Sequence, residues 1–267
     1  MQLALRIGDR SYTLLGPARD IAIPLDFYGP QPATYGVPPA TAAPYADGTF
    51  VGDVTQGGSC NFERYTLVPH CNGTHTECVG HLTRERIAVH EVLTESFFPA
   101  TLCSLAPLPA TSTTDHYLPP LDPGDLVLDR EQIVAVLQHA EAGFLDALIV
   151  RTLPNGRDKC ERDYMALRPP FFTCEAMEAI HAAGVRHLLV DFPSVDRLFD
   201  EGRLSAHRRF WGLAEGAQSV AVHLPQTITE MVYVPDDIAD GRYLLELQLA
   251  PFMADAAPSR PRLFALT

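Results

Sequence analysis

The feature that most constrains this chain is a short segment, Pro69–Thr83, which contains nearly every side-chain type that binds a transition metal. Its sequence, PHCNGTHTECVGHLT, holds three histidines, two cysteines and one glutamate. In an extended chain, side chains two residues apart point the same way. The residues that would share one face are Cys71, His75, Glu77 and His81.

The length of such a strand limits how these side chains could meet. An extended run from 71 to 81 spans about 33 Å at about 3.3 Å per residue, whereas positions 75 and 77 lie only about 6.6 Å apart. The outer side chains can join the inner pair only if the chain bends, and the glycines at 73 and 80 permit bends. The segment therefore predicts a metal site, and the alternative is a surface loop that binds no ion.

The residues Asn72–His81 resemble the signature of the cyclase family of metal-dependent hydrolases, which includes bacterial kynurenine formamidases (arylformamidases) and isatin hydrolases. The family pattern is H-x-G-T-H-x-D-x-P-x-H. The positions that agree with it are Gly73, Thr74, His75 and His81. Cys71 replaces the first histidine, Glu77 the aspartate and Val79 the proline. Because cysteine and glutamate both bind zinc, these differences keep the class of chemistry and change its metal preference.

The resemblance implies further site residues along the chain, over about residues 20–252. His207 matches a later histidine ligand of the family and Glu230 its glutamate ligand, with His223 as a competitor for a ligand position. The implied metal ligands are Cys71, His75, Glu77, His207 and Glu230. Zinc is the expected ion, and manganese is the second candidate.

The stretch from 20 to 50 is rich in proline and glycine and carries several aromatic residues. We expect a strand at Ile21–Leu25 followed by a long loop, and long ordered loops are often functional. In the family the matching segment helps to wall the substrate pocket, which makes Phe27 and Tyr28 candidate substrate-binding residues. The alternative is a surface loop anchored by core aromatics.

The resemblance also implies a mechanism, hydrolysis of a C–N bond by metal-activated water. His81 takes the role of the family's acid–base catalyst and shuttles the proton to the leaving nitrogen. The expected substrate is a small aryl formamide, amide or lactam, with arylformamide hydrolysis as the first activity to test and a link to tryptophan catabolism as one option. Two alternatives stay open: a cysteine-dependent hydrolase using Cys71 or Cys78, and a catalytically inactive member that binds a small molecule or a metal.

Composition limits the partners and the location. The formal net charge of -13 argues against nucleic acid and anionic membranes, since both favour a basic face. No stretch resembles a secretory leader or a membrane span, and six cysteines do not form a dense disulfide framework. We therefore expect a cytoplasmic protein with reduced cysteines and one domain over residues 1–267. The resemblance implies a homodimer or homotetramer.

Periodicity alone leaves α/β and α+β open, whereas the resemblance implies an α/β swivelling β/β/α fold with a mixed, partly barrel-like sheet and flanking helices. Helices are expected after Asp129, where Gln132 completes a capping box, and from Thr173 to Gly184. Strands are expected over 62–68, 87–93, 125–128, 147–150 and 185–190, with a loop over most of 99–123. The segment Asp191–Asp196 resembles a D-x-P-S-x-D pattern of the family, and plain turn chemistry is the alternative; Ser194 is interpreted as structural.

Overall fold

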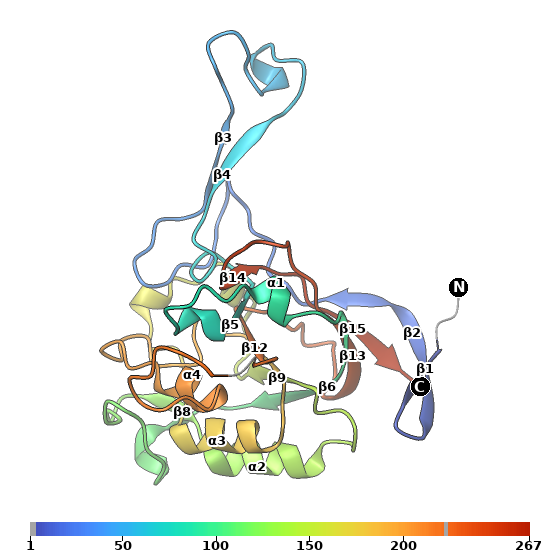
Figure 1. Ribbon diagram of the computed structural model, residues 1–267, viewed down its shortest axis with the longest axis vertical. Coiled ribbons are helices and arrows are strands. Elements are labelled where there is room, and N and C mark those ends of the chain that lie inside the picture. Colours follow the sequence, from blue (N-terminus) through green and yellow to red (C-terminus); the bar gives the residue numbers. More distant parts are fainter. Residues whose placement is uncertain (1–3, 222–223) are drawn as a thin grey trace.

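A computed structural model of the protein describes residues 4–221 and 224–267 (Figure 1). Most of its strands belong to one mixed sheet of ten strands. In spatial order these are β1 (Ala4–Ile7), β2 (Arg10–Asp20), β15 (Arg262–Leu266), β13 (Gly241–Glu246), β6 (Phe97–Leu105), β9 (Ala147–Thr152), β11 (His187–Val190), β12 (Thr227–Glu230), β5 (His75–Cys78) and β14 (Ala256–Pro258).

The centre of the sheet is parallel and both of its sides are antiparallel. Strands β6, β9, β11 and β12 run parallel to their neighbours within that group, and the other pairings are antiparallel. The mixed α/β fold predicted above is thus confirmed. The partly barrel-like closure is not seen, because among the described residues the sheet ends at β1 on one side and β14 on the other with no pairing between them.

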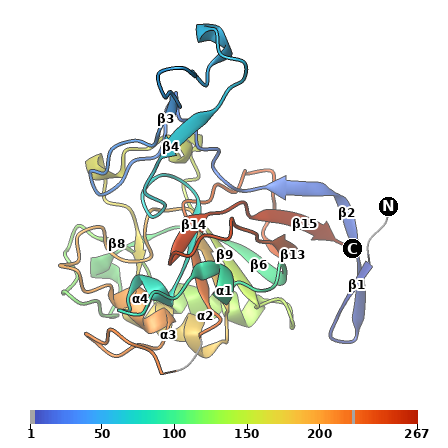
Figure 2. The same ribbon diagram turned by 45° about the horizontal axis from the view of Figure 1, so that its top comes forward.

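Helices cover one face of the parallel strands (Figures 1 and 2). They are α2 (Arg130–His139), α3 (Cys174–Ala182) and α4 (Ser205–Phe210), with α3 packed between the other two. The expected capping box starts α2, since the Asp129 carboxylate accepts from the backbone of Gln132. Thr173 caps α3 in the same way, and Gly184 beyond its end has a φ of +77°.

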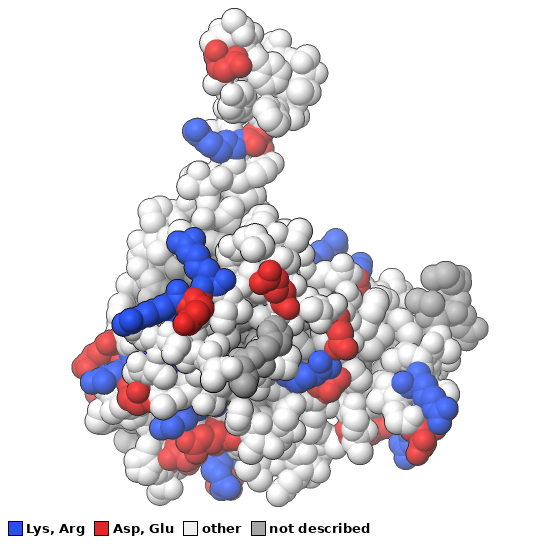
Figure 3. All heavy atoms as spheres, viewed as in Figure 1, with Lys and Arg blue, Asp and Glu red and all other residues white. Residues whose placement is uncertain are grey.

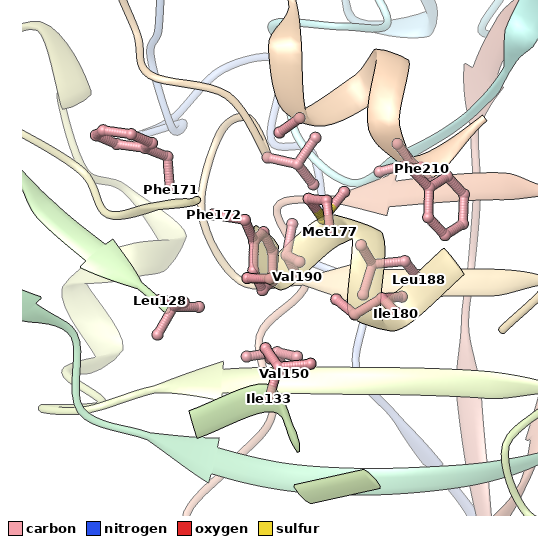
Figure 4. Packing of buried hydrophobic residues seen from close by; sticks show 14 of the residues in the cluster. Leu128, Ile133, Val150, Phe171, Phe172, Met177, Ile180, Leu188, Val190 and Phe210 are labelled. Carbon is pink, nitrogen blue, oxygen red and sulfur yellow. The ribbon is translucent and has the colours of Figure 1, made fainter. Parts of the chain in front are cut away.

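Both faces of the central strands are buried, as parallel strands require. Leu148 and Val150 of β9 pack with the helices, whereas Ala147 and Ile149 belong to a second cluster on the other face. Figure 4 shows the first cluster, in which residues of α2 and α3 lie against the sheet. The alternation along β9 therefore places the sheet between two apolar layers.

Two strands form an arm, which Figures 1 and 2 show extending away from the rest of the protein. They are β3 (Thr41–Pro44) and β4 (Glu63–Thr66), paired antiparallel. The arm carries few charged residues in the view of Figure 3. It exposes Tyr45, Phe62 and Tyr65. A separate three-stranded sheet consists of β7 (Leu108–Pro109), β8 (Leu126–Leu128) and β10 (Phe171–Phe172).

Three predicted elements differ from the structure. Ile21–Leu25 is not a strand: Ala22 forms only an isolated bridge, and Pro24 has no N–H to continue pairing. Residues 87–93 contain the short helix α1 (Val89–Val92) because Val89 and Val92, three apart, both pack inward. The expected loop over 99–123 contains most of β6.

No helix within residues 4–221 and 224–267 combines the length and the apolar character needed to cross a bilayer.

A buried ion pair, Lys159–Asp191, lies at the end of β11. The Lys159 ammonium lies 2.7 Å from Asp191 Oδ2 and also donates to the Thr152 carbonyl oxygen at 2.6 Å. Asp191 accepts in turn from the Thr152 backbone N–H and hydroxyl. Asp191 therefore does more than terminate a strand, since it neutralises a lysine that has almost no access to water.

We predict that Asp191→Asn lowers the free energy of unfolding by about 3–5 kcal/mol, because it leaves the Lys159 ammonium buried without an anion. Asp9→Asn is the control: Asp9 lies on the surface beside Arg6, and its loss should change stability by less than about 0.5 kcal/mol. Urea denaturation of both variants measures this. Equal stability of the two variants would show that Lys159 and Asp191 do not depend on each other.

Candidate metal centre

The candidate metal centre lies where β5 meets β12. The two strands are antiparallel, with His75 directly opposite Glu230. Directly opposed side chains share a face, and Glu77 lies on the same face two residues further along β5. One potential ligand atom from each of His75, Glu77 and Glu230 lies within 4.8 Å of the others. Strand register thus brings together three of the five predicted ligands.

His75 has the geometry of a neutral histidine ligand. Its Nδ1–H donates to the carbonyl oxygen of Gly73 at 3.0 Å, and Gly73 has a φ of +96° that favours glycine. The other ring nitrogen of His75, Nε2, has no hydrogen-bond partner among the described residues, although the ring is fully buried. This nitrogen lies 3.4 Å from Glu230 Oε2. A buried acceptor beside a carboxylate is the arrangement that a bound cation would satisfy, so the donor set fits a metal.

His207, on α4, lies beside this group without belonging to it, with Nε2 3.7 Å from Glu230 Oε1. Its Nδ1–H donates to Asp196 Oδ2 at 2.5 Å, which leaves Nε2 directed at Glu77 Oε1, 2.7 Å away. Burial lowers the pKa of His207, but the Glu77 and Asp196 carboxylates outweigh burial and hold the pKa well above its ordinary value. A carboxylate that orients a histidine is typical of metal sites. Asp196 is the last residue of the segment that resembles the family's D-x-P-S-x-D pattern, but no role at the site was predicted for it.

The two glutamates differ in their surroundings. Burial raises the pKa of Glu77, but the neighbouring histidines, His81 first and then His207, bring it well below its usual range. The Oε1 atom of Glu230 accepts from the backbone N–H of Val195 at 2.8 Å. Hydrogen bonds therefore fix the orientation of both side chains, to His207 for Glu77 and to the Val195 backbone for Glu230.

Cys71 lies beside this cluster without belonging to it. Its side chain lines the same pocket, but neither group of potential ligand atoms found among the described residues includes it. Burial, together with the charge of Glu230, raises the pKa of the Cys71 thiol to about 11. Burial raises that of Cys78 to about 12, and its Sγ–H donates to the Ile87 carbonyl. These protonated thiols do not favour the cysteine-dependent alternative, which needs a thiolate.

Two histidines stand at the edge of the cluster. His81 ends the 3₁₀ helix η2 (Val79–His81), and its ring stacks on His70 with centroids 4.3 Å apart. The ring of His81 lies 5.6 Å from that of His207. His70 Nδ1 lies 2.8 Å from Glu77 Oε2. The sequence analysis gave His70 no role, because it occupies no position of the family pattern.

A pocket of about 670 Å³ opens over these residues, a size suited to a small molecule. Apolar side chains, among them Leu198, Phe199 and Leu204, line it opposite the histidines and glutamates. Tyr35 also lines it, and burial and then the charge of Glu230 raise the pKa of its phenol, which keeps the hydroxyl protonated. Among the aromatic residues of the long loop, Tyr35 is therefore the one that reaches the pocket.

The predicted substrate-binding residues Phe27 and Tyr28 do not line this pocket. Phe27 stacks on Tyr65 of the arm, with ring centroids 4.6 Å apart. Tyr28 is mostly exposed and donates its hydroxyl to Glu63. The two rings thus contact the arm. Within one chain they anchor the loop there and do not contact the pocket. The competitor ligand His223 lies outside the described residues.

Comparison with known proteins identifies the family of the chain and its fold. The Cyclase family model, described as "Putative cyclase", matches residues 19–197, and the chain belongs to this family. The resemblance found in Asn72–His81 is thereby confirmed. No curated protein sequence matches the chain.

Solved structures share the fold at low identity. A predicted metal-dependent hydrolase from Bacillus stearothermophilus is 17% identical, with a TM-score of 0.59 over 93% of this chain and 98% of that chain. An isatin hydrolase bound to the product analogue thioisatinate is 14% identical, with a TM-score of 0.61 over 94% and 92%. Isatin hydrolase A from Labrenzia aggregata, bound to benzyl benzoate, is also 14% identical, with a TM-score of 0.60 over 93% of each chain.

We predict that His75→Ala and Glu77→Ala each abolish stoichiometric zinc binding, because each removes one of the three side chains whose ligand atoms lie within 4.8 Å of one another. His139→Ala is the control, since His139 is exposed on α2 and bonds only within its own helix. Elemental analysis of the three purified variants measures the effect. Full metal occupancy in both His75→Ala and Glu77→Ala would refute the assignment.

Proposed function

We propose that this protein is a metal-dependent hydrolase that cleaves the C–N bond of a small aryl formamide, amide or lactam, in the manner of a kynurenine formamidase. The observation that carries the proposal is the buried, unpartnered Nε2 atom of His75 facing Glu230 at the pocket. Membership of the cyclase family supports it. So do the neighbouring structures, which include isatin hydrolases.

In this proposal His75, Glu77, His207 and Glu230 hold the ion, and Cys71 is a further ligand at the edge of the pocket. Two histidines and two carboxylates suit zinc and also manganese, with zinc favoured by the cysteine. When bound, the ion activates water as a nucleophile and polarises the substrate carbonyl.

The remaining residues bind substrate and move the proton. Leu198, Phe199 and Leu204 offer an apolar wall for an aryl ring, and the Tyr35 hydroxyl offers a hydrogen-bond donor. His81 is partly exposed to the pocket and carries the proton to the leaving nitrogen, a task suited to a histidine near neutral pH. An amine leaves poorly without that proton, so the amide bond needs His81 more than an ester does.

We further propose that the whole chain forms one hydrolase domain that works as a homodimer or homotetramer in the cytoplasm. The exposed aromatic residues of the arm support an interface, since exposed apolar patches often mark contact sites. In such an assembly Phe27 and Tyr28, at the base of the arm, could reach the pocket of a neighbouring copy. The six free cysteines support a reducing compartment.

We predict that zinc-loaded protein hydrolyses at least one member of a panel containing formanilide, acetanilide and isatin. EDTA should abolish the activity and zinc should restore it, whereas iodoacetamide should leave it largely intact. Loss with iodoacetamide but not with EDTA would favour the cysteine-dependent alternative. No turnover of any formamide, amide or lactam by the metal-loaded protein would favour the inactive binding protein.

We predict that His81→Ala keeps its metal and its melting temperature but loses about 10²–10⁴-fold in turnover of the amide, because the leaving nitrogen is no longer protonated. The loss should be smaller on 4-nitrophenyl acetate, whose leaving group needs no proton. His81→Gln should behave like His81→Ala. Equal losses on both substrates would refute the proton-transfer role, and loss of metal would make His81 a ligand.

A further inference from the structure

Asp255 lies next to the candidate metal centre although it belongs to a distant part of the sequence. It comes directly before β14, beyond residues 19–197 that the family model matches. Its carbonyl oxygen accepts from the backbone N–H of Cys78 at 3.0 Å, and the next residue, Ala256, is paired with Glu77. The backbone pairing of β14 with β5 therefore fixes the position of the Asp255 backbone, from which its side chain extends.

This carboxylate contacts both histidines at the edge of the cluster. Asp255 Oδ2 lies 2.9 Å from His70 Nε2 and 3.4 Å from His81 Nδ1. The other ring nitrogen of His70 lies 2.8 Å from Glu77 Oε2. A continuous series of polar contacts thus runs from Asp255 through His70 to a candidate metal ligand, with a branch to His81.

The backbone near Asp255 leaves no space for a side chain at position 80. A Cβ atom at Gly80 would lie 2.3 Å from the Ile87 carbonyl oxygen and 3.2 Å from the Asp255 Cβ. A side chain at position 80 would clash with the Ile87 carbonyl oxygen, so glycine is needed where η2, which carries His81, packs beside Ile87 and Asp255. Glycine at position 80 therefore lets the turn that carries His81 lie against Ile87 and Asp255.

We propose that Asp255 is a positioning residue for the reaction, orienting His81 directly and the metal ligand Glu77 through His70. The proposal rests on the metal-dependent hydrolysis proposed above. By accepting from His81 Nδ1–H, the carboxylate leaves Nε2 of that ring free to exchange a proton. By accepting from His70 Nε2–H at 2.9 Å, it fixes the ring of His70, whose Nδ1 lies 2.8 Å from Glu77 Oε2. Glu77 then keeps its other oxygen on the side of His207.

The charges agree with this arrangement. Hydrogen bonds from His70 and then His81 hold the pKa of Asp255 well below its ordinary value, so the group stays ionised at neutral pH. His70 donates to an ionised carboxylate, and such a charge-assisted hydrogen bond is stronger than a neutral one. Partners of this kind behind a metal ligand typically contribute about 10- to 100-fold to metal affinity or activity.

The first test is zinc affinity, measured by competition with a chelator. Asp255→Asn and His70→Ala should each weaken affinity about 10- to 100-fold while the stoichiometry stays that of the unmodified protein. Asp237→Asn is the matched control, because Asp237 pairs with Arg19 on the surface and should leave affinity unchanged. Asp255→Glu should recover part of the loss, and melting temperatures identify any variant that fails to fold.

The double variant separates positioning from a general structural effect. Because Asp255 acts on Glu77 only through His70, Asp255→Asn should cost no further zinc affinity in a His70→Ala background. Likewise, Asp255→Asn should lower turnover of formanilide more than that of 4-nitrophenyl acetate. In a His81→Ala background, Asp255→Asn should not change the ratio of the two turnover rates further. Additive losses in both backgrounds would overturn the proposal.

The outcomes also separate this proposal from the proposed function. If the unmodified protein binds no zinc, both fail. If it binds zinc and Asp255→Asn behaves like Asp237→Asn, the metal centre stands and only the positioning role is refuted. Loss of one whole metal equivalent in Asp255→Asn would also refute it, because the group His70, Glu77 and His81 would then itself hold an ion.

Discussion

The structure of the site depends on one buried carboxylate, that of Glu77. A carboxylate without access to water is strongly unfavourable unless charged or hydrogen-bonding partners surround it. One oxygen of Glu77 lies 2.7 Å from His207 Nε2 and the other lies 2.8 Å from His70 Nδ1. Each of these rings is held in turn by another aspartate, Asp196 or Asp255. The Glu77 carboxylate is therefore flanked by two histidines, and each histidine is held in turn by an aspartate.

The sheet explains how residues so far apart in sequence come together. Strand β5 carries His75 and Glu77 and lies between β12, which supplies Glu230, and β14, which follows Asp255. Antiparallel register places opposed side chains on one face, so a shift of either neighbour by one residue would turn its side chain away. The pairing of β5 with β12 and β14 thus determines both the sheet and the positions of the site residues.

The sequence predicted the local part of this architecture well. The capping residues of α2 and α3 and the strand expected over 147–150 depend on neighbouring residues, and these predictions are confirmed. Strand β6 was missed because Pro99 suggested a loop, yet residues 97–99 pair with β13 alone and the pairing with β9 begins only at Ala100. Local pattern cannot reveal which end of a strand lacks a second neighbour.

The same distinction holds at the site. The segment from 71 to 81 and its family resemblance predicted His75, Glu77 and His81, and the match to later segments predicted His207 and Glu230. The roles of Asp196 and Asp255 could not be predicted, although Asp196 falls on a family pattern, because these roles depend on which side chain the fold brings within hydrogen-bond distance. Phe27 and Tyr28 were predicted to line the pocket because they are aromatic residues in the expected loop. In the fold, both contact the arm.

The measurement that most directly tests this account is anomalous diffraction at the zinc edge from crystals of the zinc-loaded protein. The account predicts a peak at about 2.0–2.2 Å from His75 Nε2, His207 Nε2 and oxygens of Glu77 and Glu230. A peak bound elsewhere, or none at this position in fully loaded protein, would contradict it.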